Sequence, residues 1–172
     1  MPDFFFGKPA KPEWYPPDTD EKKKRMGEFF AGPASPPDTA AKIPDVIQEI
    51  NKQCPGITKW GSLGMCWGGK IVSLTSTSGT LFSASAEVHP AMVDPNDAKG
   101  ITVPLCLLAS KDENPDDVKK FKENLVVNNF VETYDDQLHG WMAARATLED
   151  PKVKSEYERG YKRLLDFYHE HL

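Results

Sequence analysis

The sequence predicts an α/β fold with a mostly parallel sheet, and two observations support this class. Apolar runs such as "LFSASAEVHP" and "ITVPLCLLASKDE" are continuous rather than alternating, as expected of strands covered on both faces. Segments with helical spacing separate these runs, which is typical of strand-helix-strand units and parallel pairing. The chain has 172 residues, 39% of them hydrophobic, so we predict a single domain over residues 1–172.

The N-terminal part of the chain predicts a loop followed by two helices. The first 18 residues are rich in proline and aromatic side chains, which favours an ordered loop. Thr19 is the predicted N-cap of a polar helix over "TDEKKKRMGEFF". A second helix is predicted over "SPPDTAAKIPDVIQEINKQCPG", ending near Gly56. The buried face of the second helix is predicted to contain Val46, Ile47 and Ile50.

The rest of the chain alternates between predicted strands and helices. A strand in "ITKWGSLGMC" is followed by a turn at Cys66 and a helix. A later helix over "NPDDVKKFKENL" has Asn114 as its predicted N-cap, and "NNFVETYDD" predicts the last strand. The tail from Val153 to Leu172 repeats apolar residues at helical spacing, so it predicts a final helix.

Composition excludes several classes of partner. The formal net charge is -5 and no basic stripe is present, so we expect no nucleic-acid partner. No apolar run approaches the ~20 residues that span a bilayer, and the N-terminus lacks a charged leader with an apolar h-region. We therefore expect no membrane partner and a cytoplasmic location. The three cysteines are an odd number at wide spacing, which fits neither a disulfide framework nor a zinc site.

Three reactive side chains are predicted at the carboxyl ends of strands, where parallel sheets gather functional groups. Cys66, Asp112 and His139 follow each other in the order nucleophile, acid, histidine, which is the chain order of the α/β-hydrolase triad. Gly64 and Gly68 stand two residues before and after the cysteine, as in a nucleophile elbow, where a Cβ would collide with neighbouring elements. Cys54 and Cys106 lack this setting and are interpreted as structural.

The sequence leaves open which acidic residue is the acid of the triad. Asp112 ends the run "PLCLLAS", but Glu113 or Asp116 could take its role, and each could instead be a charge at a helix start. His89 in "EVHPAM" also ends a strand, where it either lines the substrate pocket or is structural.

Two basic residues are candidates for binding a substrate carboxylate. Arg145 lies six residues after His139 and could form a two-pronged hydrogen bond, although a solvated helix face explains it equally well. Lys8 is the weaker candidate. His169 and His171 point in different directions on a helix and have no evident third ligand, so no metal site and no cofactor is expected.

With these motifs, the chain resembles the dienelactone hydrolases, especially the fungal dienelactone hydrolase-like proteins. The resemblance runs from "MPDFFFGKPAKPEWYPPD" through "GMCWGGK", "EVHPAMV" and "LLASKDE" to "LHGWMAAR". It implies an α/β-hydrolase three-layer sandwich in which Cys66 is the nucleophile, His139 the general base and Asp112 the orienting acid. The backbone N–H of Trp67 would stabilise the oxyanion. The implied substrate is a small lactone or activated ester, hydrolysed through a thioester.

The resemblance also implies a difference. Family members carry further strands before the "PDFF" segment, together with a second oxyanion donor and a glutamate that controls the resting thiol. This sequence is therefore expected to start inside the domain, as an N-terminally truncated version of the fold. The strand before Cys66 would then form an open sheet edge, which favours pairing with a second copy of the chain. A non-catalytic ligand-binding or chain-pairing module is the alternative function.

Overall fold

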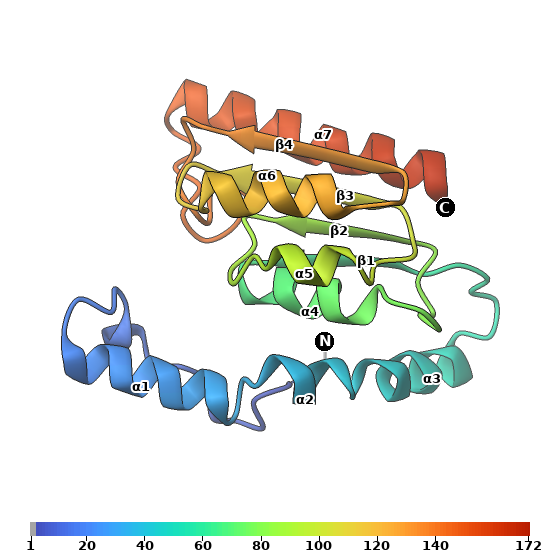
Figure 1. Ribbon diagram of the computed structural model, residues 1–172, viewed down its shortest axis with the longest axis horizontal. Coiled ribbons are helices and arrows are strands. Elements are labelled where there is room, and N and C mark those ends of the chain that lie inside the picture. The colour runs from blue at the N-terminus through green and yellow to red at the C-terminus, as the bar shows by residue number, and fades with distance from the viewer. Residues whose placement is uncertain (1–2) are drawn as a thin grey trace. The chain divides into compact units, whose positions relative to one another are not determined.

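The chain forms two compact units, Met1–Cys54 and Pro55–Leu172, in a computed structural model that describes residues 3–172. Figure 1 shows the elements of both units, and each unit is described by itself. Met1 and Pro2, with which the predicted N-terminal loop begins, lie outside the described residues. The single domain over residues 1–172 stays a prediction.

The first unit is helical. It contains a short 3₁₀ helix, η1 (Pro12–Trp14), and α1 (Asp20–Ala31), α2 (Pro36–Ala40) and α3 (Ile43–Gln53). Thr19 caps α1 through its side chain, as predicted. The prediction of a single second helix is wrong, because two helices, α2 and α3, are present. The proline in the first turn of α3 has no N–H to continue a helix from α2. Only Ile47 is buried on α3, while Val46 and Ile50 are half-buried.

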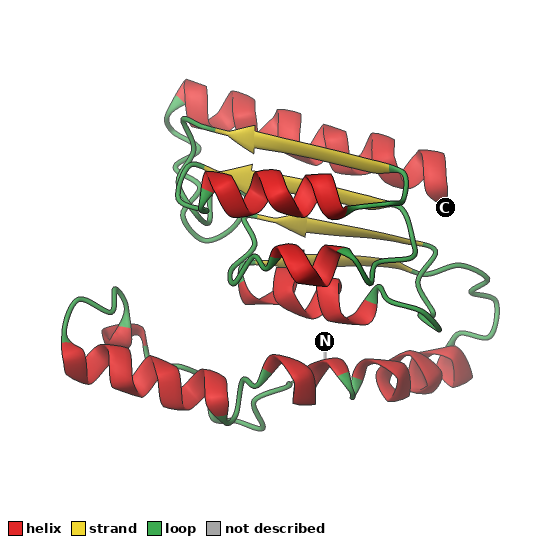
Figure 2. Ribbon diagram, viewed as in Figure 1, coloured by secondary structure: helices red, strands yellow, loops and turns green. Residues whose placement is uncertain are grey.

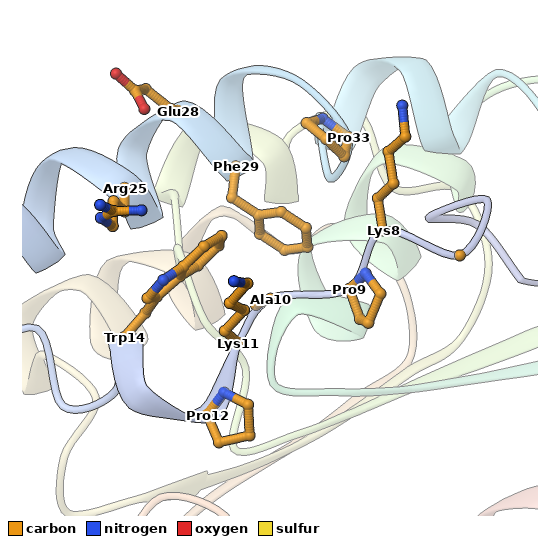
Figure 3. Close-up of a pocket in the computed structure, with 11 residues that line it drawn as sticks. Lys8, Pro9, Ala10, Lys11, Pro12, Trp14, Arg25, Glu28, Phe29 and Pro33 are labelled. Carbon is orange, nitrogen blue, oxygen red and sulfur yellow. The ribbon is translucent and has the colours of Figure 1, made fainter.

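A groove of about 610 Å³ lies between the N-terminal loop and α1 within the first unit. Figure 3 shows Trp14 and Phe29 along one part of this groove and Lys8 near another. The Trp14 and Phe29 rings meet nearly edge to face, with centroids 6.3 Å apart. These aromatic contacts order a loop that forms little regular secondary structure.

The second unit has a four-stranded parallel sheet in which sequence order and spatial order are the same. The strands β1 (Gly61–Met65), β2 (Ala84–Val88), β3 (Leu105–Ser110) and β4 (Asn129–Tyr134) pair in the order β1-β2-β3-β4. Connecting them are α4 (Trp67–Thr75), α5 (Pro95–Ala98) and α6 (Pro115–Asn124), as Figure 2 shows. The predicted strands and the Asn114 cap of α6 are confirmed, and α5 is an additional short helix.

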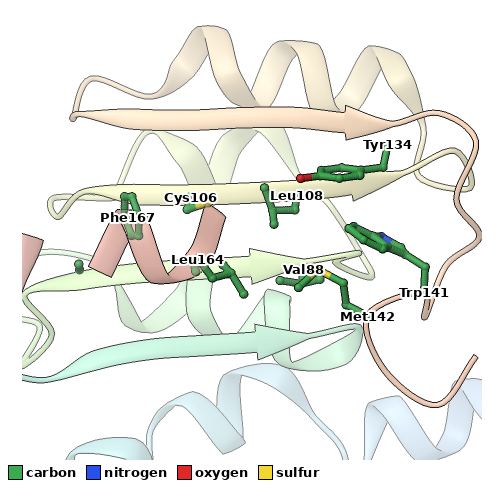
Figure 4. Close-up of a cluster of buried hydrophobic side chains, with 10 residues drawn as sticks. Val88, Cys106, Leu108, Tyr134, Trp141, Met142, Leu164 and Phe167 are labelled. Atoms are coloured by element: carbon green, nitrogen blue, oxygen red, sulfur yellow. The ribbon is translucent and has the colours of Figure 1, made fainter. Parts of the chain in front are cut away.

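The sheet lies between two layers of helices, which gives the three-layer sandwich expected from the sequence. Leu105, Leu107 and Ala109 of β3 pack with α4, α5 and α6 on one face. The alternate residues Cys106 and Leu108 pack on the other face, where Leu164 and Phe167 belong to α7 (Pro151–His171), as Figure 4 shows. The continuous apolar character of β3 therefore reflects burial on both faces.

The last helix, α7, is amphipathic. Leu164 and Phe167 are buried, whereas Leu165 is 58% exposed because it points away from the sheet. Gly160 lets Trp141 and Met142 approach closely, since a Cβ there would lie 2.6 Å from an atom of each. Neither α7 nor any other helix within residues 3–172 is both long enough and apolar enough to cross a membrane.

Candidate active site

The candidate site lies at the carboxyl edge of the parallel sheet. Cys66 directly follows β1, His89 directly follows β2, Glu113 comes three residues after β3, and His139 comes five residues after β4. Because the four strands are parallel, these residues come together at one edge although more than 70 positions separate the first from the last.

Cys66 occupies a sharp turn between β1 and α4. Its backbone has φ 54° and ψ -120°, a conformation that is unfavourable for a residue with a Cβ. Its N–H donates to the Val88 carbonyl at 3.2 Å, and its carbonyl accepts from Gly69 at 3.0 Å and Ala91 at 2.9 Å. These three bonds hold the strained residue, and the cysteine is exposed to solvent. The strand-turn-helix elbow predicted for Cys66 is therefore present.

The glycines around the cysteine have different roles. A Cβ at Gly64 would collide with the carbonyl oxygen of Gly68, so this position needs glycine, as predicted. A Cβ at Gly68 would meet nothing within 4 Å, so the predicted collision there is wrong. Gly69 has that constraint instead, because a Cβ would lie 2.6 Å from the Cβ of Pro90. The double glycine after Cys66 is the sequence signal for this contact.

The carboxylate on the histidine ring belongs to Glu113. The Nδ1 atom of His139 lies 2.7 Å from Oε1 of Glu113, and the other carboxylate oxygen of Glu113 accepts the Ser110 N–H. Asp112 instead accepts the backbone N–H of His139 at 2.8 Å through Oδ2. The expected contact between Asp112 and the ring is therefore corrected. The turn after β3 buries the longer glutamate side chain beneath the ring and leaves Asp112 exposed.

The electrostatics favour an ion pair between Cys66 and His139. Desolvation opposes ionisation of the thiol, but the hydrogen bond and positive charge of His139 and a backbone hydrogen bond from Trp67 together lower the pKa of Cys66. The hydrogen bonds to Cys66 and Glu113 raise the pKa of His139 to about 9. Both shifts favour a thiolate beside an imidazolium over the neutral pair.

The other two cysteines differ from Cys66. Burial raises the pKa of Cys106 to about 12, so this thiol stays protonated in the apolar core. Cys54 is exposed at the end of α3 in the first unit. Within the described part of the chain, no three His, Cys, Asp or Glu side chains form a group that could hold a metal ion.

Arg145 contacts the backbone of the histidine loop. Its guanidinium donates to the carbonyl oxygen of His139 at 3.0 Å, and its side chain lies over Gly140, where a Cβ would be 3.2 Å away. Gly140 has φ 93°, a conformation that favours glycine. Arg145 therefore stabilises this loop, and its predicted role in binding a substrate carboxylate stays a prediction.

The two remaining predicted site residues lie in different units. His89 is 1% exposed, and its ring centroid is 4.9 Å from that of His139. His89 therefore belongs to the same cluster as Cys66 and His139. Lys8 lines the groove of the first unit, and its role in substrate binding stays a prediction.

The parallel sheet, the helices on both of its faces and the elbow at Cys66 define an α/β-hydrolase fold. A solved structure with this architecture, a dienelactone hydrolase-like promiscuous phosphotriesterase from metagenomic libraries, is similar with a TM-score of 0.64. It is 15% identical and matches 90% of this chain and 69% of its own, which shows the fold.

The chain belongs to the dienelactone hydrolase family, whose model matches residues 1–172. It is 35% identical over 175 residues to an uncharacterized AIM2 family protein of Schizosaccharomyces pombe, covering 99% of this chain and 70% of that one. It is 23% identical over 188 residues to a carboxymethylenebutenolidase homolog of Rattus norvegicus, covering 100% of this chain and 70% of that one. Family membership supports a hydrolase of the lactone or ester type.

Proposed function

We propose that this protein hydrolyses a small lactone or an activated carboxylic ester with Cys66 as the nucleophile. The observation that carries the proposal is that the His139 ring is hydrogen-bonded to the Cys66 thiol on one side and to the buried Glu113 carboxylate on the other. A nucleophile, a base within hydrogen-bond reach and a group that orients the base are the parts of a covalent hydrolytic mechanism.

In the first half of the reaction, the Cys66 thiolate attacks the carbonyl carbon and forms a C–S bond. The carbonyl electrons move to oxygen, and the Trp67 N–H, which contacts the resting thiol, donates to this oxyanion. When the intermediate collapses, the bond to the leaving oxygen breaks and the imidazolium of His139 gives it a proton. An enol or aryl leaving group needs little assistance, which favours activated esters as substrates.

In the second half, water hydrolyses the thioester. Neutral His139 removes a proton from the water as its oxygen attacks the acyl carbon, and the collapse of this intermediate breaks the C–S bond. The products are the carboxylic acid and the regenerated thiolate-imidazolium pair. Glu113 keeps Nδ1 protonated, so that Nε2 is the nitrogen that exchanges protons with the substrate and water.

Replacing each exposed cysteine tests the proposal. Turnover of an aryl acetate should fall to background in Cys66→Ala and remain unchanged in Cys54→Ala, because both cysteines are exposed but only Cys66 contacts His139. Intact-mass measurement of the quenched wild type should detect an acetyl adduct that Cys66→Ala lacks. Equal turnover in the two variants would remove Cys66 from the mechanism.

A second candidate function is chain pairing through the outer edge of β1. Within the second unit β1 is the last strand of the sheet on its side, and Leu63 is 46% exposed. Since the Cys66 N–H points toward β2, alternation directs the N–H and C=O groups of Leu63 and Met65 away from β2. Such an edge can accept another strand, and we propose that a second copy of the chain supplies it.

The molar mass in solution tests this second candidate. Light scattering should give a dimer in the wild type and a monomer in Leu63→Lys, because a charged side chain disfavours pairing at an edge strand. A wild type that stays monomeric at every concentration measured would contradict chain pairing.

A further inference from the structure

His89 lies at the centre of the candidate site. It follows β2, between the strand that leads to Cys66 and the strand that leads to Glu113. Its N–H donates to the Leu108 carbonyl at 2.7 Å, so that its position is fixed to β3. The rings of His89 and His139 meet at 63° with their centroids 4.9 Å apart, which is an edge-to-face contact.

The ring nitrogens of His89 make no hydrogen bond within the described residues. Both nitrogens are buried without a partner, and the residue is 1% exposed. An unpaired buried N–H is unfavourable, so the imidazole at this position lowers the stability of the fold. Its φ of 36° is a second unfavourable feature, although histidine adopts positive φ more readily than most residues. Two such features in one residue beside an active site favour a functional role.

We propose that His89 is a positioning residue whose ring holds the imidazole of His139 in the orientation that serves both Cys66 and Glu113. This inference rests on the proposed function, since it assigns a purpose to the contact between the two histidines. Nδ1 of His139 is occupied by Glu113, so Nε2 is the nitrogen left for the sulfur. Both bonds require one ring orientation, and rotation of the ring would break both together.

The surrounding charges explain why a neutral ring suits this role. Burial, followed by the positive charge of His139, lowers the pKa of His89 to about 4. The charged groups around the pair are Glu113 at Nδ1, the Cys66 sulfur, Asp112 at the backbone N–H of His139 and Arg145 at its carbonyl. A protonated His89 would add a second cation beside the imidazolium, whereas a neutral ring restrains His139 without repelling it.

Two substitutions separate the ring from its nitrogens. His89→Asn removes the ring but tolerates the positive φ, while His89→Phe keeps a ring and removes the unpaired N–H. The readout is the ultraviolet absorbance of the Cys66 thiolate against pH, with Cys66→Ser as background, together with the rate of alkylation by iodoacetamide. We expect His89→Asn to raise the Cys66 pKa and slow alkylation at neutral pH by about tenfold, because the bond from His139 is weakened. His89→Phe should remain within about twofold of the wild type.

The inference is overturned if folded His89→Asn titrates like the wild type. It is also overturned if folded His89→Phe loses as much thiolate as His89→Asn, since the nitrogens would then be what matters. These measurements need no ester. A wild type that has the thiolate but does not hydrolyse esters would contradict the proposed function and leave the role of His89 standing.

Imidazole ¹⁵N NMR of the wild type provides a test that does not depend on the variants folding. We expect His89 to remain a neutral tautomer down to about pH 5, above its pKa of about 4, while His139 stays doubly protonated until about pH 9. A His89 that titrates with an ordinary histidine pKa would be accessible to water and would overturn the inference.

Discussion

The Nδ1 atom of His139 lies 2.7 Å from a carboxylate oxygen of Glu113, while the neighbouring Asp112 binds the backbone N–H of the same histidine at 2.8 Å. Two adjacent acids therefore hold one histidine in two ways. Glu113 is buried and determines which ring nitrogen carries the proton, whereas Asp112 is exposed and fixes the loop.

Isosteric amides should separate the two acids. We expect Glu113→Gln to lower kcat for an aryl ester by about 10²-fold or more, because an amide no longer stabilises the imidazolium or enforces its tautomer. Asp112→Asn should change kcat by less than about threefold, since the amide oxygen still accepts a backbone N–H. Steady-state kinetics on both variants measure the difference. The reverse order of losses would make Asp112 the orienting acid.

The ionisation of the Cys66 thiol should depend on His139. The pKa of Cys66 is lowered and the pKa of His139 is raised to about 9, so the ion pair exists between these two pKa values. Turnover of an ester with an alkyl leaving group should fall above the upper of these values, because His139 then lacks the proton that such a leaving group needs. In His139→Gln the remaining desolvation should raise the Cys66 pKa, so thiolate absorbance should appear only at higher pH than in the wild type. A thiol that stays ionised in His139→Gln would contradict the pairing.

The glycines of the elbow should respond differently to alanine. Gly64→Ala places a Cβ against the Gly68 carbonyl, where only backbone movement can relieve the clash, and we expect a loss of about 3 kcal/mol or more. Gly68→Ala enters open space on α4 and should leave stability unchanged or raise it by up to about 1 kcal/mol. Urea denaturation followed by circular dichroism gives both values. Equal losses would show that the elbow has no specific need for glycine at Gly64.

Glu87 should make stability depend on pH. Burial raises the pKa of this carboxyl to about 8, and the Ser73 hydroxyl donates to it at 2.6 Å. The folded state therefore binds more protons than the unfolded state between the ordinary glutamate pKa of 4.5 and about 8. Stability should fall as pH rises through this window, by up to about 1.4 kcal/mol per pH unit from this group.

Glu87→Gln is the control for that dependence. The amide keeps an acceptor for the Ser73 hydroxyl and cannot ionise, so its free energy of unfolding should decline less toward alkaline pH than that of the wild type. Chemical denaturation at several pH values measures the two slopes. Parallel slopes would mean that Glu87 does not titrate in this range.

The local order of the chain determined much of the fold. Continuous apolar runs predicted the strands, and the caps at Thr19 and Asn114 predicted two helix starts. Gly64, two residues before Cys66, predicted the elbow. Each of these features depends on neighbouring residues alone. The order of Cys66, an acid and His139 likewise predicted a hydrolase site. The prediction of one helix in place of α2 and α3 was wrong. The proline in the first turn of α3 interrupts the helix only because α2 ends just before it, and the sequence did not show where α2 ends.

Only the tertiary structure decided which acid binds the ring, what Arg145 contacts and why His89 is buried. The turn after β3 determines whether Asp112 or Glu113 reaches the imidazole, and side-chain reach across 26 positions of chain is not encoded in local spacing. The contact of His89 with His139 depends on the pairing of β3 with both β2 and β4. Sequence determines the chemical groups and their local conformations, whereas packing determines which groups come within the few ångströms at which pKa values shift.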